Sequence, residues 1–222
     1  MKSTLLQRFF APPRSKRLFD VVGAVGGLVA FSPVMAAIAA AIALDDGRPI
    51  LFRQARVGLG RRTFTIVKFR SMRAGGVTRV GRFLRATGLD ELPQFLNILH
   101  GDMSAVGPRP LTESDVQRLG WNARRYDFRW RVRPGLTGPA QVMGTTSAPL
   151  SACLDRWYVA RQRLSLDVRM VVLSFAVNAL GKTRVRQWLL RARDGAGTAV
   201  LTASVGTARS PERRVRARRI GA

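Results

Sequence analysis

The chain has 222 residues, and its 38 Lys and Arg against 13 Asp and Glu give a formal net charge of +25. This length fits one domain with a buried core rather than two independent domains. The single Cys153 excludes an internal disulfide and a cysteine-based zinc site, and the single His100 excludes a histidine cluster. So basic a chain predicts polyanionic partners: nucleic acid, an anionic membrane surface or phosphorylated small molecules. The alternative explanation is a GC-rich genome, which favours Arg.

An uncharged apolar segment, residues 21–44, follows a basic N-terminal segment, residues 1–20. It is long enough to span a bilayer as one helix and too long for the apolar region of a secretory signal. Ser32 and Pro33 lie near its centre. The proline removes a backbone donor and therefore predicts a bend. The Ser32 hydroxyl can satisfy a carbonyl that the proline leaves free.

The charges that flank this segment predict how it lies in the membrane. Lys and Arg prefer the cytoplasmic side when they lie within about 20 residues of a membrane segment. They are equally frequent on the two sides: Lys2, Arg8, Arg14, Lys16 and Arg17 before the segment, and Arg48, Arg53, Arg56, Arg61 and Arg62 after it. We therefore predict a re-entrant helix that bends at Ser32 and Pro33 and returns to the cytoplasmic side. A straight span with a kink and a buried helix of a soluble protein are the alternatives.

Residues 45–182 are predicted to form a small cytoplasmic domain. Loosely alternating apolar residues in 51–69, interrupted by turn signals in 57–60, predict a short β-hairpin. The tail, residues 183–222, is rich in Arg and small residues, so we expect it to be disordered and to contact anionic lipid.

Helical spacing predicts most of the remaining elements. We expect a short helix that begins within 80–84, a helix over 93–99 that stops at Gly101, a surface or membrane-interface segment over 111–130, a loop over 133–142 that feeds a short strand, and helical structure over 154–180 with a break near Leu164 and Ser165. The apolar run 170–177 is too short to span a bilayer and predicts an interfacial or a core helix.

Two adjacent carboxylates, Asp90 and Glu91, precede the helix predicted to start at Pro93. Leu92 is biased away from the α region because a proline follows it, whereas proline is acceptable in a first helical turn. Free N–H groups at a helix start favour anions, which would keep these carboxylates ionised. An ionised carboxylate can attack phosphorus, and two of them beside a diphosphate suggest Mg²⁺. The alternative is an ordinary acidic pair at a helix start.

Basic residues at several places in the sequence are candidates for phosphate binding: Lys68, Arg70, Arg85, Arg109 and Arg133. Arg109 stands between two prolines, which suits rigid bidentate contacts to phosphate. Gly135 and Gly138 allow a ligand to approach the backbone closely. Any one of these charges alone can be a solvated surface charge, but their density around one acidic pair predicts a phosphate site.

With these residues the chain resembles the bacterial sugar transferases of the small, monotopic phosphoglycosyl transferase family. The matching stretches are 16–20 (KRLFD), 32–33 (SP), 52–58 (FRQARVG), 68–72 (KFRSM), 78–84 (TRVGRFL), 89–94 (LDELPQ), 101–104 (GDMS), 106–110 (VGPRP) and 133–138 (RPGLTG). The chain departs from the family pattern in a trimmed segment between Met72 and Thr78, in Gly88 and Pro139, and in the loop 144–152.

The resemblance implies transfer of a sugar phosphate from a UDP-sugar to undecaprenyl phosphate, with release of UMP. It implies that Asp90 is the nucleophile that forms a covalent phospho-sugar intermediate, and that Glu91 shares metal binding or proton handling. It also implies an acidic partner at Asp167 and a membrane helix break at Ser32 and Pro33.

The predicted fold class is α/β, mostly α: a membrane re-entrant helix-break-helix followed by a small cytoplasmic catalytic domain with interfacial helices and a short β-hairpin. The expected location is the bacterial inner membrane, with the catalytic domain facing the cytoplasm. Expected partners are a UDP-sugar, undecaprenyl phosphate, membrane lipids and other enzymes of polysaccharide assembly, with Mg²⁺ as cofactor. We expect no nucleic acid, since no nucleic-acid-binding module is recognisable. An inactive homologue and a basic membrane-surface protein are the alternatives.

Overall fold

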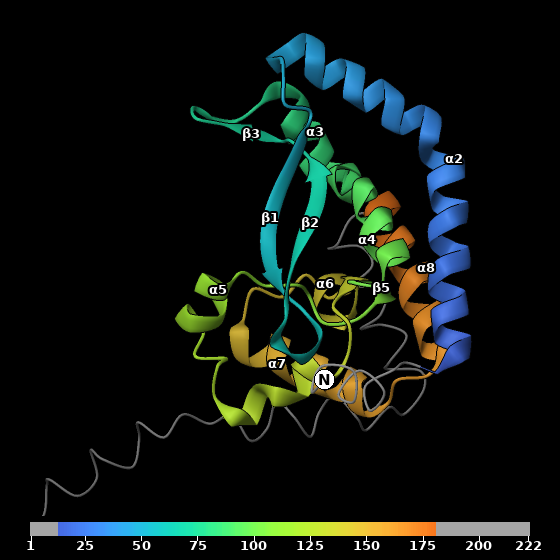
Figure 1. The fold of residues 1–222 in the computed structure, drawn as a ribbon, viewed down its shortest axis with the longest axis vertical. Helices are drawn as coiled ribbons and strands as arrows, with labels where there is room; N and C mark the ends of the chain where they lie inside the picture. The colour runs from blue at the N-terminus through green and yellow to red at the C-terminus, as the bar shows by residue number, and fades with distance from the viewer. Residues whose placement is uncertain (1–12, 181–222) are drawn as a thin grey trace, which may run out of the picture. The chain divides into compact units, whose positions relative to one another are not determined.

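The computed structural model describes residues 13–180, which are mostly helical with small sheets and one long apolar helix near the N-terminus (Figure 1). The helices are α2 (Arg14–Asp46), α3 (Arg79–Thr87), α4 (Phe95–His100), α5 (Glu113–Arg118), α6 (Pro139–Val142), α7 (Ala148–Ala160) and α8 (Leu164–Leu180). The 3₁₀ helices are η1 (Leu59–Arg61), η2 (Leu89–Gln94) and η3 (Arg124–Arg131). The strands are β1 (Leu51–Val57), β2 (Thr63–Phe69), β3 (Met72–Arg73), β4 (Gly76–Val77), β5 (Ser104–Val106) and β6 (Gly135–Thr137).

The predicted hairpin is confirmed. Strands β1 and β2 pair antiparallel from Leu51 opposite Phe69 to Val57 opposite Thr63. A 3₁₀ turn joins them, in which Gly60 has a φ of 62°. A second antiparallel pair, β3 and β4, is very short. The parallel pair of β5 and β6 was not predicted, because strands this short give no measurable alternation in the sequence.

Helix α2 has 33 residues and stays helical through Ser32 and Pro33. Figure 1 shows that it bends within its length, as expected for a helix with an internal proline. Pro33 has no N–H for the carbonyl of Val29, and the Ser32 hydroxyl donates to that carbonyl instead, at 2.8 Å. Among the described residues, α2 is the one helix long and apolar enough to cross a membrane. Its outer face is exposed, with Val29 at 69% and Leu44 at 89%.

The N-terminal end of α2 is bound to the folded body by a buried polar network. The Lys16 ammonium donates to Asp167 at 2.8 Å and to the carbonyl of Val106 at 3.2 Å. One Asp20 carboxylate oxygen accepts from the Ser104 hydroxyl at 3.0 Å and from the backbone N–H of residue 105 at 2.9 Å. Lys16, Asp20 and Asp167 are all nearly inaccessible to solvent. These contacts fix the start of α2 against β5 and α8.

The C-terminal end of α2 is bound to the same body. The Asp46 carboxylate pairs with Arg70 at 2.9 Å and with Arg73 at 3.0 Å. Arg70 also donates to the carbonyl oxygens of Asp46 at 2.9 Å and of Gly47 at 2.7 Å, which caps the helix. The Asp45 carboxylate accepts from the N–H of Val80 at the start of α3. Both ends of the apolar helix are therefore held by one domain.

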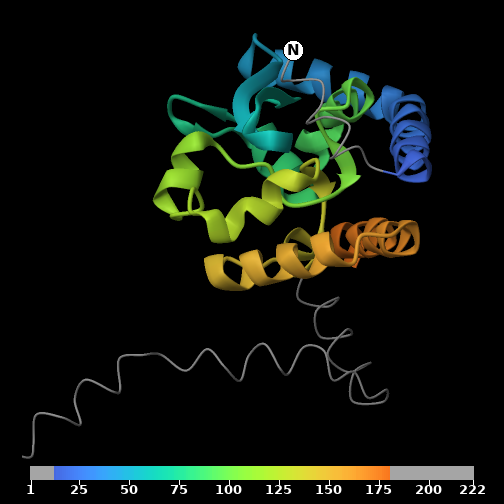
Figure 2. The same ribbon diagram turned by 60° about the horizontal axis from the view of Figure 1, so that its bottom comes forward.

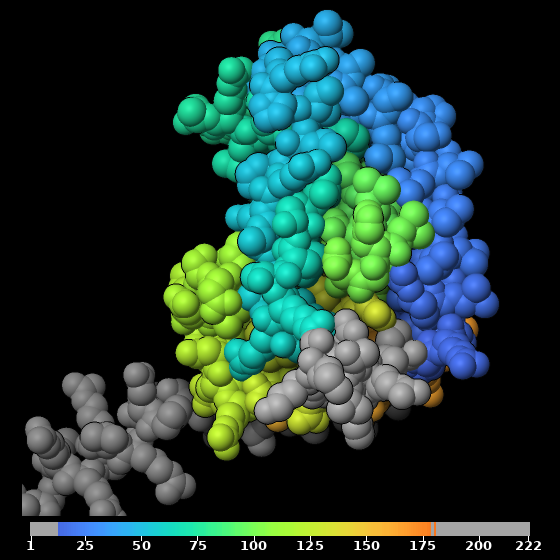
Figure 3. All heavy atoms as spheres, viewed as in Figure 1, coloured from blue at the N-terminus to red at the C-terminus, as the bar shows by residue number. Residues whose placement is uncertain are grey.

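Between its ends, α2 packs along the domain, and its atoms adjoin those of α4 in the space-filling view (Figure 3). Ile38 and Ile42 are buried with Phe69, Leu84 and Leu92 in one apolar cluster. Nearer the N-terminus, a Cβ on Gly27 would lie 2.8 Å from the ring of Phe95. Glycine therefore lets α2 and α4 come this close without displacing the ring of Phe95.

Helices α7 and α8 follow one another on one side of the described body, at an angle to each other (Figures 1 and 2). The break predicted near Leu164 is confirmed, because α7 ends at Ala160 and α8 begins at Leu164. The helical region starts earlier than expected, since Ser147 accepts from the N–H of Leu150 and so caps the start of α7.

The prediction that residues 111–130 lie on the surface or at the membrane interface was wrong in part. Val116, Trp121 and Trp130 are buried in a cluster with Val57 and Ala152. The polar residues of the segment suggested that it is exposed, but Arg129 is itself buried. Its guanidinium stacks 4.3 Å from the centre of the Trp121 ring and pairs with the buried Asp155. The loop predicted over 133–142 contains its strand, β6, and ends in α6.

The buried pair of Lys16 and Asp167 predicts a large loss of stability when one partner is removed. Asp167→Asn should lower the free energy of unfolding by about 3–5 kcal/mol, because the Lys16 ammonium then lies buried without a counter-ion. Replacing both residues, Lys16→Met with Asp167→Leu, should recover most of this loss, since Tyr158 keeps the carbonyl of Val106 as its acceptor. Thermal and urea unfolding of the protein in lipid nanodiscs measure both effects.

The exposed pair of Arg118 and Asp115 is the matched control. Arg118→Ala should change the free energy of unfolding by less than about 1 kcal/mol. An Asp167→Asn variant as stable as the Arg118→Ala control would show that the network does not hold α2.

Candidate active site

Asp90 and Glu91 lie in the first turn of η2, directly after α3. Gly88 ends α3 in the left-handed conformation, at a φ of 74°, and its carbonyl accepts from the N–H of Glu91 at 3.2 Å. The helix was predicted to begin at Pro93. It begins four residues earlier, as a 3₁₀ turn, because Gly88 reverses the chain before Pro93 is reached. Asp90 is 7% exposed, and the Glu91 side chain keeps 32% of its surface.

The side chain of Asn97 fixes the distance between this turn and the hairpin. Its amide oxygen accepts from the N–H of Val67, and its amide nitrogen donates to the carbonyl of Thr65 at 2.7 Å. Asn97 therefore pairs with β2 as a neighbouring strand would, and it brings Lys68 at the end of β2 to the carboxylates. Sequence analysis missed this role, because a buried Asn within an apolar helical run gives no sign of its partner.

Positive charges surround the carboxylates from several elements. Arg109, in the loop after β5, reaches Glu91 at 3.9 Å. Lys68 on β2 and Arg85 on α3 both act electrostatically on Asp90. Three of the predicted phosphate-binding residues therefore converge on the predicted carboxylate pair. Arg56 on β1 joins them, since its charge acts on Glu91. In the sequence, Arg56 stood out only as part of the motif 52–58 and as one of the charges that flank the apolar segment.

The loop that carries Arg109 is held by its backbone, which leaves the side chain free to reach a ligand. The carbonyl of Arg109 accepts from the buried Arg129 at 2.9 Å, and the carbonyl of Pro108 accepts from the N–H of Gly135. A Cβ on Gly107 or on Gly135 would collide with the backbone of the other segment. Burial lowers the pKa of Arg129 to about 9.

The charged groups of the site are partly shielded from water. Burial raises the pKa of Asp90 above its ordinary value, and the charge of Lys68 is the largest influence in the opposite direction. Burial likewise raises the pKa of Glu91, against the charge of Arg109. Burial lowers the pKa of Lys68, although both carboxylates oppose the shift. Fixed charges in a poorly solvated site act strongly on a bound anion.

A cavity of about 20 Å³ lies among these charges, lined by Arg56, Lys68, Glu91, Gln94, Arg109 and Gln141 together with backbone and apolar groups. Gln94 is 3% exposed. Neither side-chain amide atom of Gln141 has a hydrogen-bond partner among residues 13–180, and both are buried. Sequence analysis singled out neither glutamine.

The other predicted site residues lie elsewhere. Arg70 binds the C-terminal end of α2. Asp167 binds Lys16 and accepts from the Tyr158 hydroxyl at 2.6 Å, within the network at the start of α2. Arg133 donates to the carbonyl of Gly101 at 2.6 Å and lines a separate hollow of about 710 Å³ beside the hairpin turn. The charges that act on Arg133 are those of Arg17, Asp20 and Asp102, and not those of the carboxylate pair.

The carboxylate pair fits the predicted Mg²⁺ only if substrate phosphates and water supply its other ligands. The described residues contain no group of three or more His, Cys, Asp or Glu side chains that would hold a metal alone. Mg²⁺ is commonly held by one or two carboxylates together with substrate phosphates and water. Asp90 and Glu91 supply two adjacent carboxylates, whose pKa values burial raises, and the surrounding cations suit the phosphates.

Comparison with known proteins identifies the family. The family model described as "Bacterial sugar transferase" matches residues 12–180. A UDP-glucose:undecaprenyl-phosphate glucose-1-phosphate transferase of Caulobacter vibrioides is 42% identical over 167 residues, which cover 69% of this chain and 61% of the relative. An Aeromonas hydrophila UDP-N-acetylgalactosamine-undecaprenyl-phosphate N-acetylgalactosaminephosphotransferase is 39% identical over 175 residues, 70% of this chain and 41% of the relative. The uncharacterized sugar transferase EpsL of Bacillus subtilis is 36% identical over 173 residues, 72% of this chain and 84% of the relative.

The chain belongs to the bacterial sugar transferase family, because the family model matches most of its length. This confirms the resemblance inferred from its motifs. The chain spans 61% of the length of the Caulobacter vibrioides relative and 41% of that from Aeromonas hydrophila.

The electrostatics of the site predict how its carboxylates titrate. The pKa of Asp90 should lie above its ordinary value of 3.8, and that of Glu91 above 4.5, so both are more protonated at a given acidic pH than free carboxyl groups. Lys68→Met should raise the pKa of Asp90 further, because it removes the largest opposing charge. Carbon-13 NMR of the labelled carboxyl groups, in nanodiscs, measures these midpoints.

Asp115 is the internal reference, since its hydrogen bonds with Arg118 and Thr112 lower its pKa. Its midpoint should lie below 3.8 and should not move in Lys68→Met. An Asp90 midpoint that ignores the loss of Lys68 would contradict the pairing of these two residues.

Proposed function

We propose that this chain transfers a sugar-1-phosphate from a UDP-sugar to undecaprenyl phosphate and releases UMP. The observation that carries the proposal is the buried Asp90 beside Glu91, surrounded by the cations Lys68, Arg85 and Arg109. The names of the Caulobacter vibrioides and Aeromonas hydrophila relatives support the substrate classes. Such a reaction would be a first membrane step in exopolysaccharide, O-antigen or other glycan assembly.

In the first step, the Asp90 carboxylate attacks the β-phosphorus of the UDP-sugar. The bond between the β-phosphorus and the bridging oxygen breaks, and UMP leaves with that oxygen. The sugar phosphate stays on Asp90 as an acyl phosphate. Lys68, Arg85 and Arg109 compensate the negative charge on the phosphoryl oxygens. They also compensate the negative charge that grows on the leaving group as the bond breaks. Burial gives the attacking carboxylate a raised pKa and less hydration, which makes it a better nucleophile.

In the second step, a phosphate oxygen of undecaprenyl phosphate attacks the same phosphorus. The bond to Asp90 breaks, the carboxylate is restored, and the product is a diphosphate-linked lipid sugar. Glu91 remains beside the reacting group, and Asp90 and Glu91 would hold the metal. A bound Mg²⁺ would neutralise phosphate charge and polarise the phosphorus–oxygen bonds.

We further propose that α2 is re-entrant, so that the catalytic body lies on the cytoplasmic face of the inner membrane. A straight helix of 33 residues would be about 50 Å long and would place its ends on opposite sides of an apolar layer about 30 Å thick. Lys16 and Asp46, near the two ends, both bind the same body. A straight span would therefore require one of these anchors to break.

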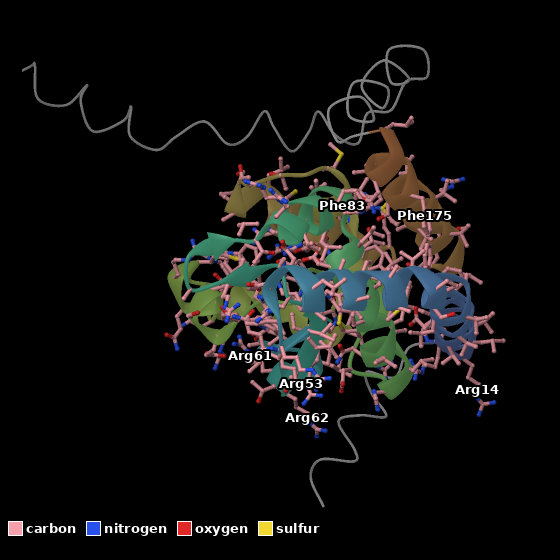
Figure 4. The ribbon with its side chains drawn as sticks, turned by 90° about the horizontal axis from the view of Figure 1, so that it is seen from above. Arg14, Arg53, Arg61, Arg62, Phe83 and Phe175 are labelled. Carbon is pink, nitrogen blue, oxygen red and sulfur yellow. The ribbon has the colours of Figure 1, made fainter. Side chains whose placement is uncertain are left out.

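The exposed apolar side chains of α3 and α8 support an interfacial position of the body. Phe83 on α3 is 60% exposed, and Val172 and Phe175 on α8 are 61% and 57% exposed. Figure 4 shows Phe83 and Phe175 on one side of the body and Arg53, Arg61 and Arg62 on the other. An apolar face opposite a basic face is typical of a protein that rests on a membrane.

The proposed nucleophile predicts a complete loss of turnover on a conservative change. Asp90→Asn should abolish UMP release from a UDP-sugar, because an amide cannot form the acyl phosphate, while membrane association stays intact. UMP release is measured with undecaprenyl phosphate, Mg²⁺ and a panel of UDP-sugars, and chelation of the Mg²⁺ should also stop it.

The matched control is Asp127→Asn, an exposed carboxylate whose partner is Arg61 on the hairpin turn. It should release UMP at the wild-type rate. Turnover retained in Asp90→Asn would remove the nucleophile assignment. Silence of the folded, membrane-inserted wild type across the panel would instead support an inactive homologue.

The re-entrant topology predicts that both flanks of α2 are inaccessible from the periplasm. Single cysteine substitutions, Arg14→Cys and Arg48→Cys, should react with an impermeant maleimide only after the inner membrane is permeabilised. The native Cys153 is exposed and must first be changed to Ser. Labelling of one flank in intact spheroplasts would establish a straight span and contradict the re-entrant arrangement.

A further inference from the structure

The side chain of Gln141 is an unpaired amide inside the proposed active site. Its nitrogen and its oxygen are both buried, and neither has a hydrogen-bond partner among residues 13–180. Burial of an unpaired amide is unfavourable, and an apolar side chain of the same length would avoid this penalty. The amide lines the same cavity as Lys68, Glu91 and Arg109. A buried polar group that stays unpaired beside a reactive site indicates a ligand that pairs it.

Backbone hydrogen bonds fix the main chain around Gln141. The carbonyl of Gly138 accepts from the N–H of Val142, and the carbonyl of Gln141 accepts from the N–H of Gly144. A Cβ on Gly138 would lie 3.0 Å from the amide oxygen of Gln141 and would collide with Gly107. The side chain therefore lies over Gly138, beside the loop that carries Arg109.

The chemistry of the amide restricts the ligand group that it can bind. Phosphate oxygens accept hydrogen bonds, so they would pair the amide nitrogen and leave the oxygen unpaired. A hydroxyl group both donates and accepts, and it satisfies either or both atoms. The cavity, about 20 Å³, suits a group about as large as one water molecule, such as a single hydroxyl.

We propose that Gln141 binds a hydroxyl group of the sugar that the donor carries on its β-phosphate, and so helps to determine which sugar is accepted. This inference rests on the proposed transfer from a UDP-sugar. The sugar is attached to the phosphorus that Asp90 attacks, so it must lie next to the cavity shared by Glu91 and Gln141. A site that pairs a substrate hydroxyl rejects analogues that lack it, because its polar groups are then left unpaired.

The test compares a ligand that carries the sugar with one that does not. UDP-glucose and UDP share the nucleoside and both phosphates, and only UDP-glucose carries the hexose. Titration calorimetry of the full chain in nanodiscs, in an Asp90→Asn background, measures both affinities without turnover. Gln141→Met keeps the length of the side chain and removes the amide, and Gln141→Asn keeps the amide and shortens its reach. The control Gln117→Met changes an exposed glutamine on α5.

Both Gln141 variants should bind UDP-glucose, or the panel sugar with the highest turnover, about tenfold more weakly, as expected for a lost hydrogen bond in a buried site. Their affinity for UDP should stay within about twofold of the background, and Gln117→Met should change neither. In the wild-type background, the discrimination between the parent sugar and its deoxy analogues should shrink in the Gln141 variants. An unchanged melting temperature shows that the variant is folded, and either variant alone suffices for the comparison.

Equal weakening of UDP and UDP-glucose would place Gln141 on the nucleotide or its phosphates and overturn the inference. Unchanged binding of both would show that the amide has no role in recognition, and would overturn it as well. The inference is separable from the proposed reaction, since the calorimetry needs no turnover. Selective weakening of UDP-glucose together with an inactive wild type would support the sugar contact and refute the transferase proposal.

Discussion

The attachment of both ends of α2 to one folded body is the constraint on which the rest of the structure depends. Lys16 and Asp20 hold the start of the helix through buried partners, and Asp46 holds its end through Arg70. The helix bends at its centre and keeps an exposed apolar face. Its inner face supplies Ile38 and Ile42 to the core that lies behind η2. The apolar helix therefore also contributes to the core of the domain that carries the carboxylate pair.

The site is built from short backbone contacts rather than from one large sheet. Asn97 pairs η2 and α4 with β2, and Gly107 and Gly135 bring the loop of Arg109 against β6. Each contact brings a charged side chain to Asp90 or Glu91 from a different part of the sequence. The raised pKa of Asp90 and the lowered pKa of Lys68 have the same cause, because both groups are largely removed from water. At both groups the effect of burial on the pKa exceeds that of the opposing charges.

The local features of the fold were predictable from the sequence. Turn residues identified the hairpin, Gly101 identified the end of α4, and Pro33 with Ser32 identified the bend in α2. The motif around Asp90 identified the family. Long-range pairs were not predictable: the buried Arg129 looks like a surface charge until Asp155 and Trp121 are placed beside it. The contacts of two predicted site residues with the ends of α2, Arg70 with Asp46 and Asp167 with Lys16, were not predictable for the same reason. Gln141 was missed because an amide in a loop motif shows its lack of partners only in three dimensions.

The network at the start of α2 also links the first described helix to the last one. Lys16 leaves the ribosome long before Asp167, its partner 151 positions later in the chain. The buried pair of Lys16 and Asp167 can therefore form only after α8 has been made. Completion of α8 is thus the step that allows the start of α2 to be fixed against the folded body.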